Sequence, residues 1–223
     1  MIHKEVLREV VDKLHAAYPE ASIGIGGSVA NETYRADSDI DILLMKEGQV
    51  ESFSITCMYR GIRISIFSFS ISFILKNERR YLYSFHEMPI TFISGASIIY
   101  DDKGLIQKLK ETVRDIMERR FYLKDVLIDK LKNEITRLCM LDSQSSLLRK
   151  QIHYTIADGM LSIFFLSKMP RLITKKQIKF NWYDCMIVQD EYLCRCLKKY
   201  MLYSDCSAEA LKGLFKNYVL TNY

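Results

Sequence analysis

The sequence predicts an α+β protein in which a mixed β-sheet with helices over residues 1–103 is followed by an all-α helical bundle over residues 104–223. In the first part, short apolar or alternating runs are separated by turn residues, a pattern typical of strands. After Gly104 the apolar residues recur at helical spacing, and the rest of the chain holds only two glycines, Gly159 and Gly213. Helical periodicity throughout, with few glycines, favours a helical bundle.

The elements of the first part follow from periodicity and from turn residues. Apolar residues three and four positions apart predict a helix over 2–18, which Pro19 ends. Arg60-Gly61 between two apolar runs predicts a hairpin, and Ser94-Gly95 separates two short strands. The predicted order is a helix over 2–18, a strand over 22–26, a short helix beginning near Ser28, strands over 39–45, 50–59 and 62–70, a helix over 72–86, and strands over 90–93 and 97–100.

The second part reads as consecutive helices. Their predicted ranges are 104–120, 123–141, 144–167, 174–181, 187–203 and 207–217. Pro170 separates the third helix from the fourth, because proline disrupts a helix interior.

Composition narrows the class of protein. Hydrophobic residues make up 49% and charged residues 26% of the 223 positions, as in a globular protein with a core. The apolar runs are shorter than a membrane span and the first residues resemble no signal peptide, so we expect a cytoplasmic protein without membrane contact. The net charge of +5 favours anionic ligands such as nucleotides, but it is too small to indicate nucleic acid as a partner. Six cysteines without a Cys-x-x-Cys pair are expected to be reduced thiols.

Two short motifs carry the clearest chemical information. Gly26-Gly27-Ser28 follows an apolar run, and Asp39-Ile40-Asp41 opens the strand predicted over 39–45. Alternation along a strand places Asp39 and Asp41 on one face, where two carboxylates repel each other unless a cation such as Mg²⁺ lies between them. The glycines let the backbone approach a ligand, and Ser28 opens a helix whose free N–H groups suit a phosphate. These are the parts needed for phosphoryl or nucleotidyl transfer.

Gly27-Ser28, a ten-residue gap, Asp39-Ile40-Asp41 and the apolar residues after it resemble the motif of the DNA polymerase beta-like nucleotidyltransferase superfamily. Within it, the chain is similar to small bacterial enzymes of the kanamycin and lincosamide nucleotidyltransferase type. The resemblance covers roughly the first 100 residues, the size of one small domain.

The resemblance implies an activity and the residues that carry it. Such a protein binds a nucleoside triphosphate, ATP above all, with Mg²⁺ as cofactor, and transfers the nucleoside monophosphate to a hydroxyl, releasing pyrophosphate. Gly27 and Ser28 would hold the phosphates, Arg35 is a further phosphate candidate in the loop between the motifs, and Asp39 and Asp41 would hold the metal. The acceptor would be a small molecule, such as an aminoglycoside or a lincosamide, or a protein side chain, bound with the help of the helical domain. The oligomeric state stays open.

The superfamily normally supplies a third carboxylate from a neighbouring strand, which helps to hold metal and serves as the base. Here that position falls on Ser65, and serine is no anionic ligand at neutral pH. Arg63 shares the strand face of Ser65 and would repel a second cation if it pointed at the site.

Three explanations of Ser65 remain open. Glu87 or Glu134 completes the site, with Glu134 as the candidate catalytic base from the helical domain. Alternatively, the protein binds nucleotide with one metal and reacts slowly. Finally, it is a degenerate, non-catalytic member that serves as a nucleotide-binding regulator or an antitoxin-like partner.

Overall fold

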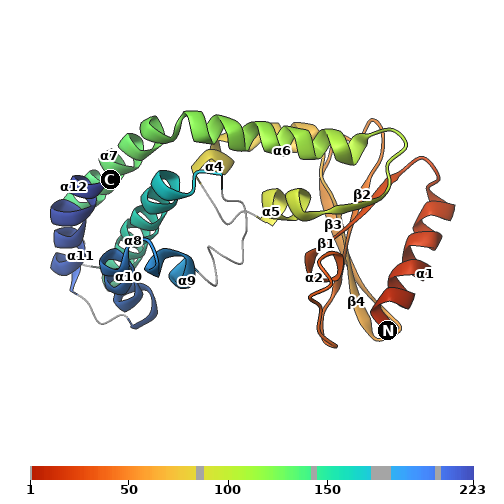
Figure 1. The fold of residues 1–223 in the computed structure, drawn as a ribbon, viewed down its shortest axis with the longest axis horizontal. Coiled ribbons are helices and arrows are strands. Elements are labelled where there is room, and N and C mark those ends of the chain that lie inside the picture. The colour runs from red at the N-terminus through yellow and green to blue at the C-terminus, as the bar shows by residue number, and fades with distance from the viewer. Residues whose placement is uncertain (1, 84–87, 142–144, 172–181, 204–206) are drawn as a thin grey trace. The chain divides into compact units, whose positions relative to one another are not determined.

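The computed structural model describes residues 2–83, 88–141, 145–171, 182–203 and 207–223. The chain forms two compact units, one comprising Met1–Tyr81 with Glu87–Ile116 and the other Leu82–His86 with Met117–Tyr223. Helix α6 (Leu105–Tyr122) runs through this division. The α+β class is confirmed, because the first unit holds a mixed sheet and the second is helical throughout its described part (Figure 1).

The described residues of the first unit form a five-stranded sheet in the order β3-β4-β2-β1-β5. Its strands are β1 (Ser22–Gly26), β2 (Ile40–Met45), β3 (Phe53–Tyr59), β4 (Ile62–Ser68) and β5 (Ser97–Tyr100). β2 pairs with β4 in parallel, whereas the other neighbours are antiparallel. The central strands β1 and β2 are mostly buried, as expected for strands that are covered on both faces.

The two faces of the sheet carry different helices. Helix α1 (Ile2–Ala17) covers one face, where Val6 and Val11 pack with Ile40, Ile42 and other strand residues in one apolar cluster. On the opposite face, α5 (Met88–Gly95) brings Phe92 against Phe67, with ring centroids 5.0 Å apart. Side chains alternate along β2, so this second face is the one that carries Asp39 and Asp41.

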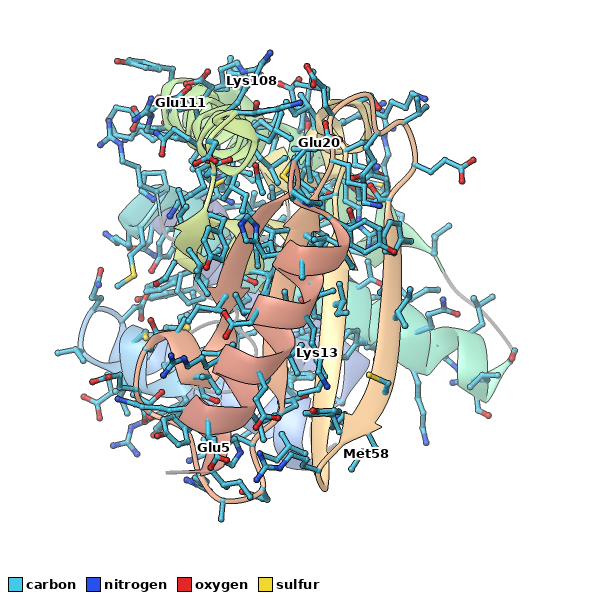
Figure 2. The ribbon with its side chains drawn as sticks, turned by 90° about the vertical axis from the view of Figure 1, so that its right-hand side faces the viewer. Glu5, Lys13, Glu20, Met58, Lys108 and Glu111 are labelled. Carbon is cyan, nitrogen blue, oxygen red and sulfur yellow. The ribbon has the colours of Figure 1, made fainter. Side chains whose placement is uncertain are left out.

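The β3–β4 hairpin is fastened to α1 at its tip. Arg60 and Gly61 both have positive φ, 49° and 79°, as a two-residue type I′ turn requires. The Arg60 guanidinium donates to Glu5 (2.9 Å) and Glu9 (2.6 Å) on α1. Figure 2 shows Glu5 and Lys13 on α1, with Met58 near the end of β3. The predicted hairpin is therefore confirmed, although its first strand begins at Phe53 rather than residue 50.

Two predictions in the first unit are wrong. Residues 90–93 belong to helix α5 and not to a strand; a short apolar run suits either, and Pro89 favours the first turn of a helix. The helix predicted over 72–86 is instead α3 (Ile71–Lys76) and α4 (Glu78–Tyr83), with residues 84–86 outside the described part. Asn77 caps the end of α3, and its side chain donates to the Phe73 carbonyl oxygen at 2.9 Å. Helix α2 (Gly27–Ala30) is a single turn.

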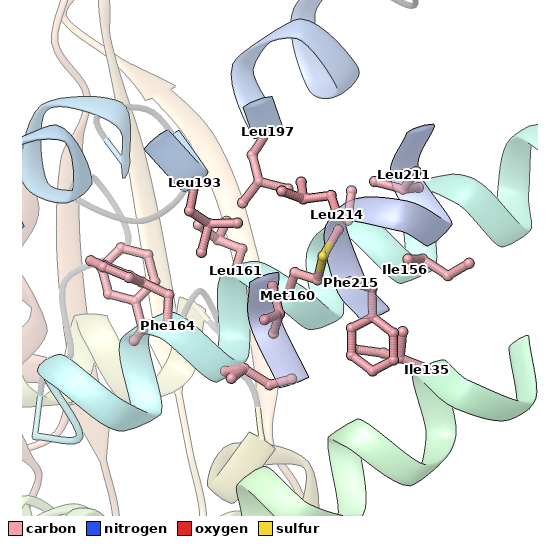
Figure 3. Packing of buried hydrophobic residues seen from close by; sticks show 14 of the residues in the cluster. Ile135, Ile156, Met160, Leu161, Phe164, Leu193, Leu197, Leu211, Leu214 and Phe215 are labelled. Carbon is pink, nitrogen blue, oxygen red and sulfur yellow. The ribbon is translucent and has the colours of Figure 1, made fainter. Parts of the chain in front are cut away.

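The second unit packs around helix α8 (Ser146–Lys168). Buried side chains of α7 (Lys124–Met140), α8, α10 (Glu191–Tyr203) and α11 (Ala208–Leu214) form one hydrophobic cluster, in which Ile135, Met160, Phe164 and Leu211 are among the members (Figure 3). Ser145 fixes the start of α8, because its hydroxyl accepts the Leu148 N–H, so the helix begins at 146 and not at 144.

The C-terminal helices differ from prediction at their ends. A separate short helix, α9 (Trp182–Ile187), precedes α10, and the Asp190 carboxylate accepts the Leu193 N–H where α10 begins. The helix predicted over 207–217 continues as a π-helix (Phe215–Val219) and as α12 (Leu220–Asn222). The helix predicted over 174–181 lies outside the described residues. None of the described helices has the length and apolarity that crossing a membrane would require.

Candidate active site

The two carboxylates predicted as a pair do lie on one face of the sheet, and strand register fixes their neighbours. Asp41 on β2 faces Gly26 of β1 on one side and Ser65 of β4 on the other. Asp39 lies just before β2 and is 34% exposed at its side chain. The site is therefore carried by three adjacent strands in the middle of the sheet.

Asp41 is held in an environment that disfavours its charge. Burial, followed by repulsion from Asp39, raises the pKa of Asp41 to about 6, while the nearby Arg63 lowers it. A carboxylate in this state gains more than an exposed one when a cation arrives, because the cation offsets both the desolvation and the repulsion. The donor set of this pair suits a hard divalent ion such as Mg²⁺.

Asp39 already has one cationic partner. Arg63 Nη2 on β4 donates to Asp39 Oδ2 at 2.8 Å, so Arg63 does point at the carboxylate pair. Its side chain is 61% exposed, and such solvated pairs contribute little to stability. Arg63 therefore supplies a positive charge that can exchange partners when another ligand approaches.

The Gly-Gly turn lies directly against the carboxylate. Gly27 has a φ of +67°, and a Cβ at this position would lie 2.5 Å from Asp41 Oδ2. A Cβ on Gly26 would lie 2.2 Å from the Phe92 ring. Both positions require glycine because of close contacts, Gly27 with Asp41 and Gly26 with Phe92. Gly26 is buried, whereas Gly27 is exposed and presents its backbone next to the carboxylate.

Ser65 occupies the strand position that faces Asp41. It is 7% exposed, and its hydroxyl lies 3.4 Å from the Thr56 hydroxyl of the edge strand β3. No further acid joins the pair: in the part of the chain that the structure describes, no group of three or more His, Cys, Asp or Glu residues could hold a metal ion.

The other predicted site residues lie on α2, in the loop that follows it, and in the second unit. Ser28 is half-buried on α2, and Arg35 is exposed in the loop, where its N–H donates to the Ser38 hydroxyl at 2.8 Å. Glu134 is exposed on α7 of the second unit, and its catalytic role stays a prediction. Glu87 lies outside the described residues.

Sequence reasoning missed two residues that shape this site. Phe92 packs where Gly26 has no side chain, and Thr56 contacts Ser65 from the neighbouring strand. Phe92 was missed because residues 90–93 were predicted to form a strand. The hairpin turn at Arg60-Gly61 could have revealed Thr56, because a two-residue turn pairs Tyr59 with Ile62 and hence Thr56 with Ser65.

Replacing Gly27 tests whether the turn positions Asp41. Gly27→Ala and its control Gly48→Ala should each lose about 1 kcal/mol of stability, because both residues have φ near +70°. The two sites differ in their surroundings, since an added Cβ at Gly48 meets nothing within 4 Å. Only Gly27→Ala should displace the Asp41 carboxylate toward solvent and lower its pKa, as followed by a carboxyl NMR titration. An unchanged Asp41 titration in Gly27→Ala would show that the turn does not constrain this side chain.

The raised pKa of Asp41 predicts a pH dependence of stability. Between about pH 4 and pH 6 the unfolded chain has released the Asp41 proton while the folded protein retains it, so stability falls as pH rises through this window. The free energy of unfolding is measured with urea in the presence of a chelator. By pH 7 the free energy of unfolding of wild type should have fallen by about 2 kcal/mol relative to that of Asp41→Asn. The control Asp37→Asn, at an exposed loop residue, should follow wild type. Parallel curves for wild type and Asp41→Asn would contradict the burial argument.

The comparisons with known proteins agree with this geometry. The family model described as a nucleotidyltransferase domain matches residues 5–135, more than half of the chain. Among solved structures, the chain is similar to a nucleotidyltransferase-like protein from Exiguobacterium sibiricum, at 13% identity and a TM-score of 0.52, over 96% of this chain and 73% of that one. At that identity the likeness concerns the fold alone. No curated protein matches. On the strength of the family match, this chain belongs to the nucleotidyltransferase domain family.

Proposed function

We propose that the protein is an Mg²⁺-dependent enzyme that transfers a nucleoside monophosphate from a nucleoside triphosphate, ATP above all, to a hydroxyl acceptor and releases pyrophosphate. The observation that carries the proposal is the contact between the two motifs: the Gly26-Gly27 turn abuts a carboxylate whose pKa is raised by burial and by its acidic neighbour. A glycine turn that can bind an anion, placed directly against two carboxylates that repel each other, suits a metal–triphosphate ligand.

In the first unit, some residues would bind the phosphates and others would bind the metal. The backbone of Gly27 and Ser28 would bind the triphosphate, with Arg35 as a further candidate for a phosphate contact. Asp39 and Asp41 would hold Mg²⁺, which when bound supplies charge neutralisation at the transferred phosphate. Arg63 can leave Asp39 and pair with a phosphate oxygen, because its side chain is mostly exposed and its present ion pair is weak.

The proposed reaction also requires an acceptor. A hydroxyl group on a small molecule, of the aminoglycoside or lincosamide kind, or on a protein side chain is what the sequence resemblance favours. The attack of that hydroxyl needs a base, and Ser65 does not provide one at neutral pH. Glu134 is the candidate that the sequence offers for this role.

A labelling experiment tests the activity. Purified protein is incubated with each nucleoside triphosphate labelled at the α-phosphate, with and without Mg²⁺, and with a panel of aminoglycosides, lincosamides and hydroxyl-bearing proteins. We expect Mg²⁺-dependent transfer of label with release of pyrophosphate. Asp41→Asn should lose about a hundredfold or more of the rate, because electrostatic stabilisation carries most of this chemistry. Glu134→Gln with Asp129→Asn as an exposed control on the same helix tests the base.

Two outcomes would contradict the enzyme. Metal-independent nucleotide binding that is equal in wild type and Asp41→Asn would remove the site from nucleotide chemistry. Tight Mg²⁺–nucleotide binding without transfer to any acceptor would favour the nucleotide-binding regulator instead.

Restoring the third carboxylate gives a second prediction. Ser65→Asp adds an acid directly beside Asp41, where burial already disfavours charge, so the melting temperature should fall in the absence of metal. Added Mg²⁺ should recover it, and Mg²⁺ affinity should rise about tenfold because three anionic oxygens offset metal dehydration better than two. The control Ser54→Asp, on the exposed edge strand, should change neither quantity. A lower melting temperature with unchanged Mg²⁺ affinity would show that position 65 does not reach the metal.

A further inference from the structure

The second unit contains a cavity of about 530 Å³, to which the proposed nucleotidyl transfer assigns no residue. It opens between α10, α11 and the π-helix, and three tyrosines line it: Tyr192, Tyr200 and Tyr218. Its volume lies within the range of ~300–1,000 Å³ that is usual for small-molecule sites. All of its lining residues belong to the second unit, so the cavity exists independently of the candidate active site.

Hydrogen bonds hold two of the three tyrosines in place, Tyr200 and Tyr218. The Tyr218 hydroxyl donates to both carboxylate oxygens of Asp190, at 3.0 and 3.2 Å, and the Tyr200 hydroxyl donates to the Ser207 carbonyl oxygen. The Tyr192 and Tyr218 rings contact each other, with centroids 4.7 Å apart at an interplanar angle of 53°. Fixed rings lose little conformational entropy when a flat ligand binds against them.

The polar groups at the cavity leave one charge without a partner. Lys199 lines the cavity, is exposed, and forms no ion pair within the described part of the chain, whereas Lys212 pairs with Glu209 and Arg195 pairs with Glu191. Asn217 adds an amide at the same opening. An ammonium group beside aromatic rings selects a ligand that carries a negative charge next to a planar apolar body.

The backbone at this cavity departs from ordinary helix geometry. Residues Phe215–Val219 form a π-helix, and two of them, Asn217 and Tyr218, line the cavity. Single π-helical turns are rare and occur frequently at functional sites. Here the wider turn lets Phe215 and Val219 stay buried in the core while Asn217 and Tyr218 face the cavity.

We propose that this cavity is a ligand site for a planar aromatic anion, which stacks among Tyr192, Tyr200 and Tyr218 and pairs its acidic group with Lys199. The site goes beyond nucleotidyl transfer and does not require it, since none of its residues belongs to the first unit.

The experiment uses a matched pair of probes, 2-naphthoate and its neutral amide, 2-naphthamide, titrated into the full-length protein and followed by ligand fluorescence and calorimetry. Wild type should bind both saturably, naphthoate more tightly. Lys199→Gln should weaken naphthoate about fivefold and leave naphthamide unchanged, because an exposed ion pair is worth up to about that factor. Lys216→Gln, an exposed lysine on the π-helix that does not line the cavity, is the control and should bind like wild type.

Filling the cavity separates occlusion from unfolding. Gly213 lines the cavity within α11, and a Cβ added there meets no atom within 4 Å. Gly213→Leu should therefore keep or raise the melting temperature, as glycine replacement in a helix does, while both probes lose at least tenfold in affinity. Ala210→Leu, one turn earlier on the same helix, is a second occluding variant. Absence of saturable binding in wild type, or unchanged binding in a folded occluding variant, would overturn the proposal.

Discussion

The register of β1, β2 and β4 is the constraint on which the candidate active site depends. It sets Asp41 between a glycine and a serine, so that the carboxylate is buried by backbone and small side chains rather than by apolar bulk. A slip of one residue would turn Asp39 and Asp41 into the apolar cluster under α1 and bring Ile40 and Ile42 to the site. The isoleucines packed against α1 therefore hold the carboxylates in place as much as any contact the carboxylates make themselves.

The negative charge of the two carboxylates is partly compensated by an arginine on the same face of the sheet. When Asp39, Asp41 and Arg63 are all ionised, this face of the sheet carries a single excess negative charge. That balance explains how the fold tolerates a partly buried acid pair, and it leaves the pair able to accept a further cation. A third acid at position 65 would add to this excess negative charge, whereas Ser65 and Thr56 place neutral hydroxyl groups there.

The helical unit is built on a different principle. Its core is a continuous set of apolar side chains around α8, and the Asp190 carboxylate accepts hydrogen bonds from the Tyr218 and Tyr223 hydroxyl groups. These bonds tie the last helical segments to the start of α10, and the half-buried Tyr218 ring that they orient lines the cavity. Such an arrangement gives a rigid aromatic surface without consuming the lysine beside it.

The sequence by itself determined the fold class, the motif and the shared face of Asp39 and Asp41, because periodicity of two along a strand and glycine at a turn are local properties. The family resemblance placed Ser65 at the position of the third carboxylate, and the pairing of β2 with β4 sets it opposite Asp41. The tertiary structure decided what local pattern leaves open: the apolar run over 90–93, which suits a strand or a helix, lies in α5, where Phe92 packs against Gly26 and Phe67. The tertiary structure also decided the Asp39–Arg63 ion pair and the burial of Asp41, since both depend on which strands lie side by side. It decided the π-helix as well, because that turn follows from packing against the core.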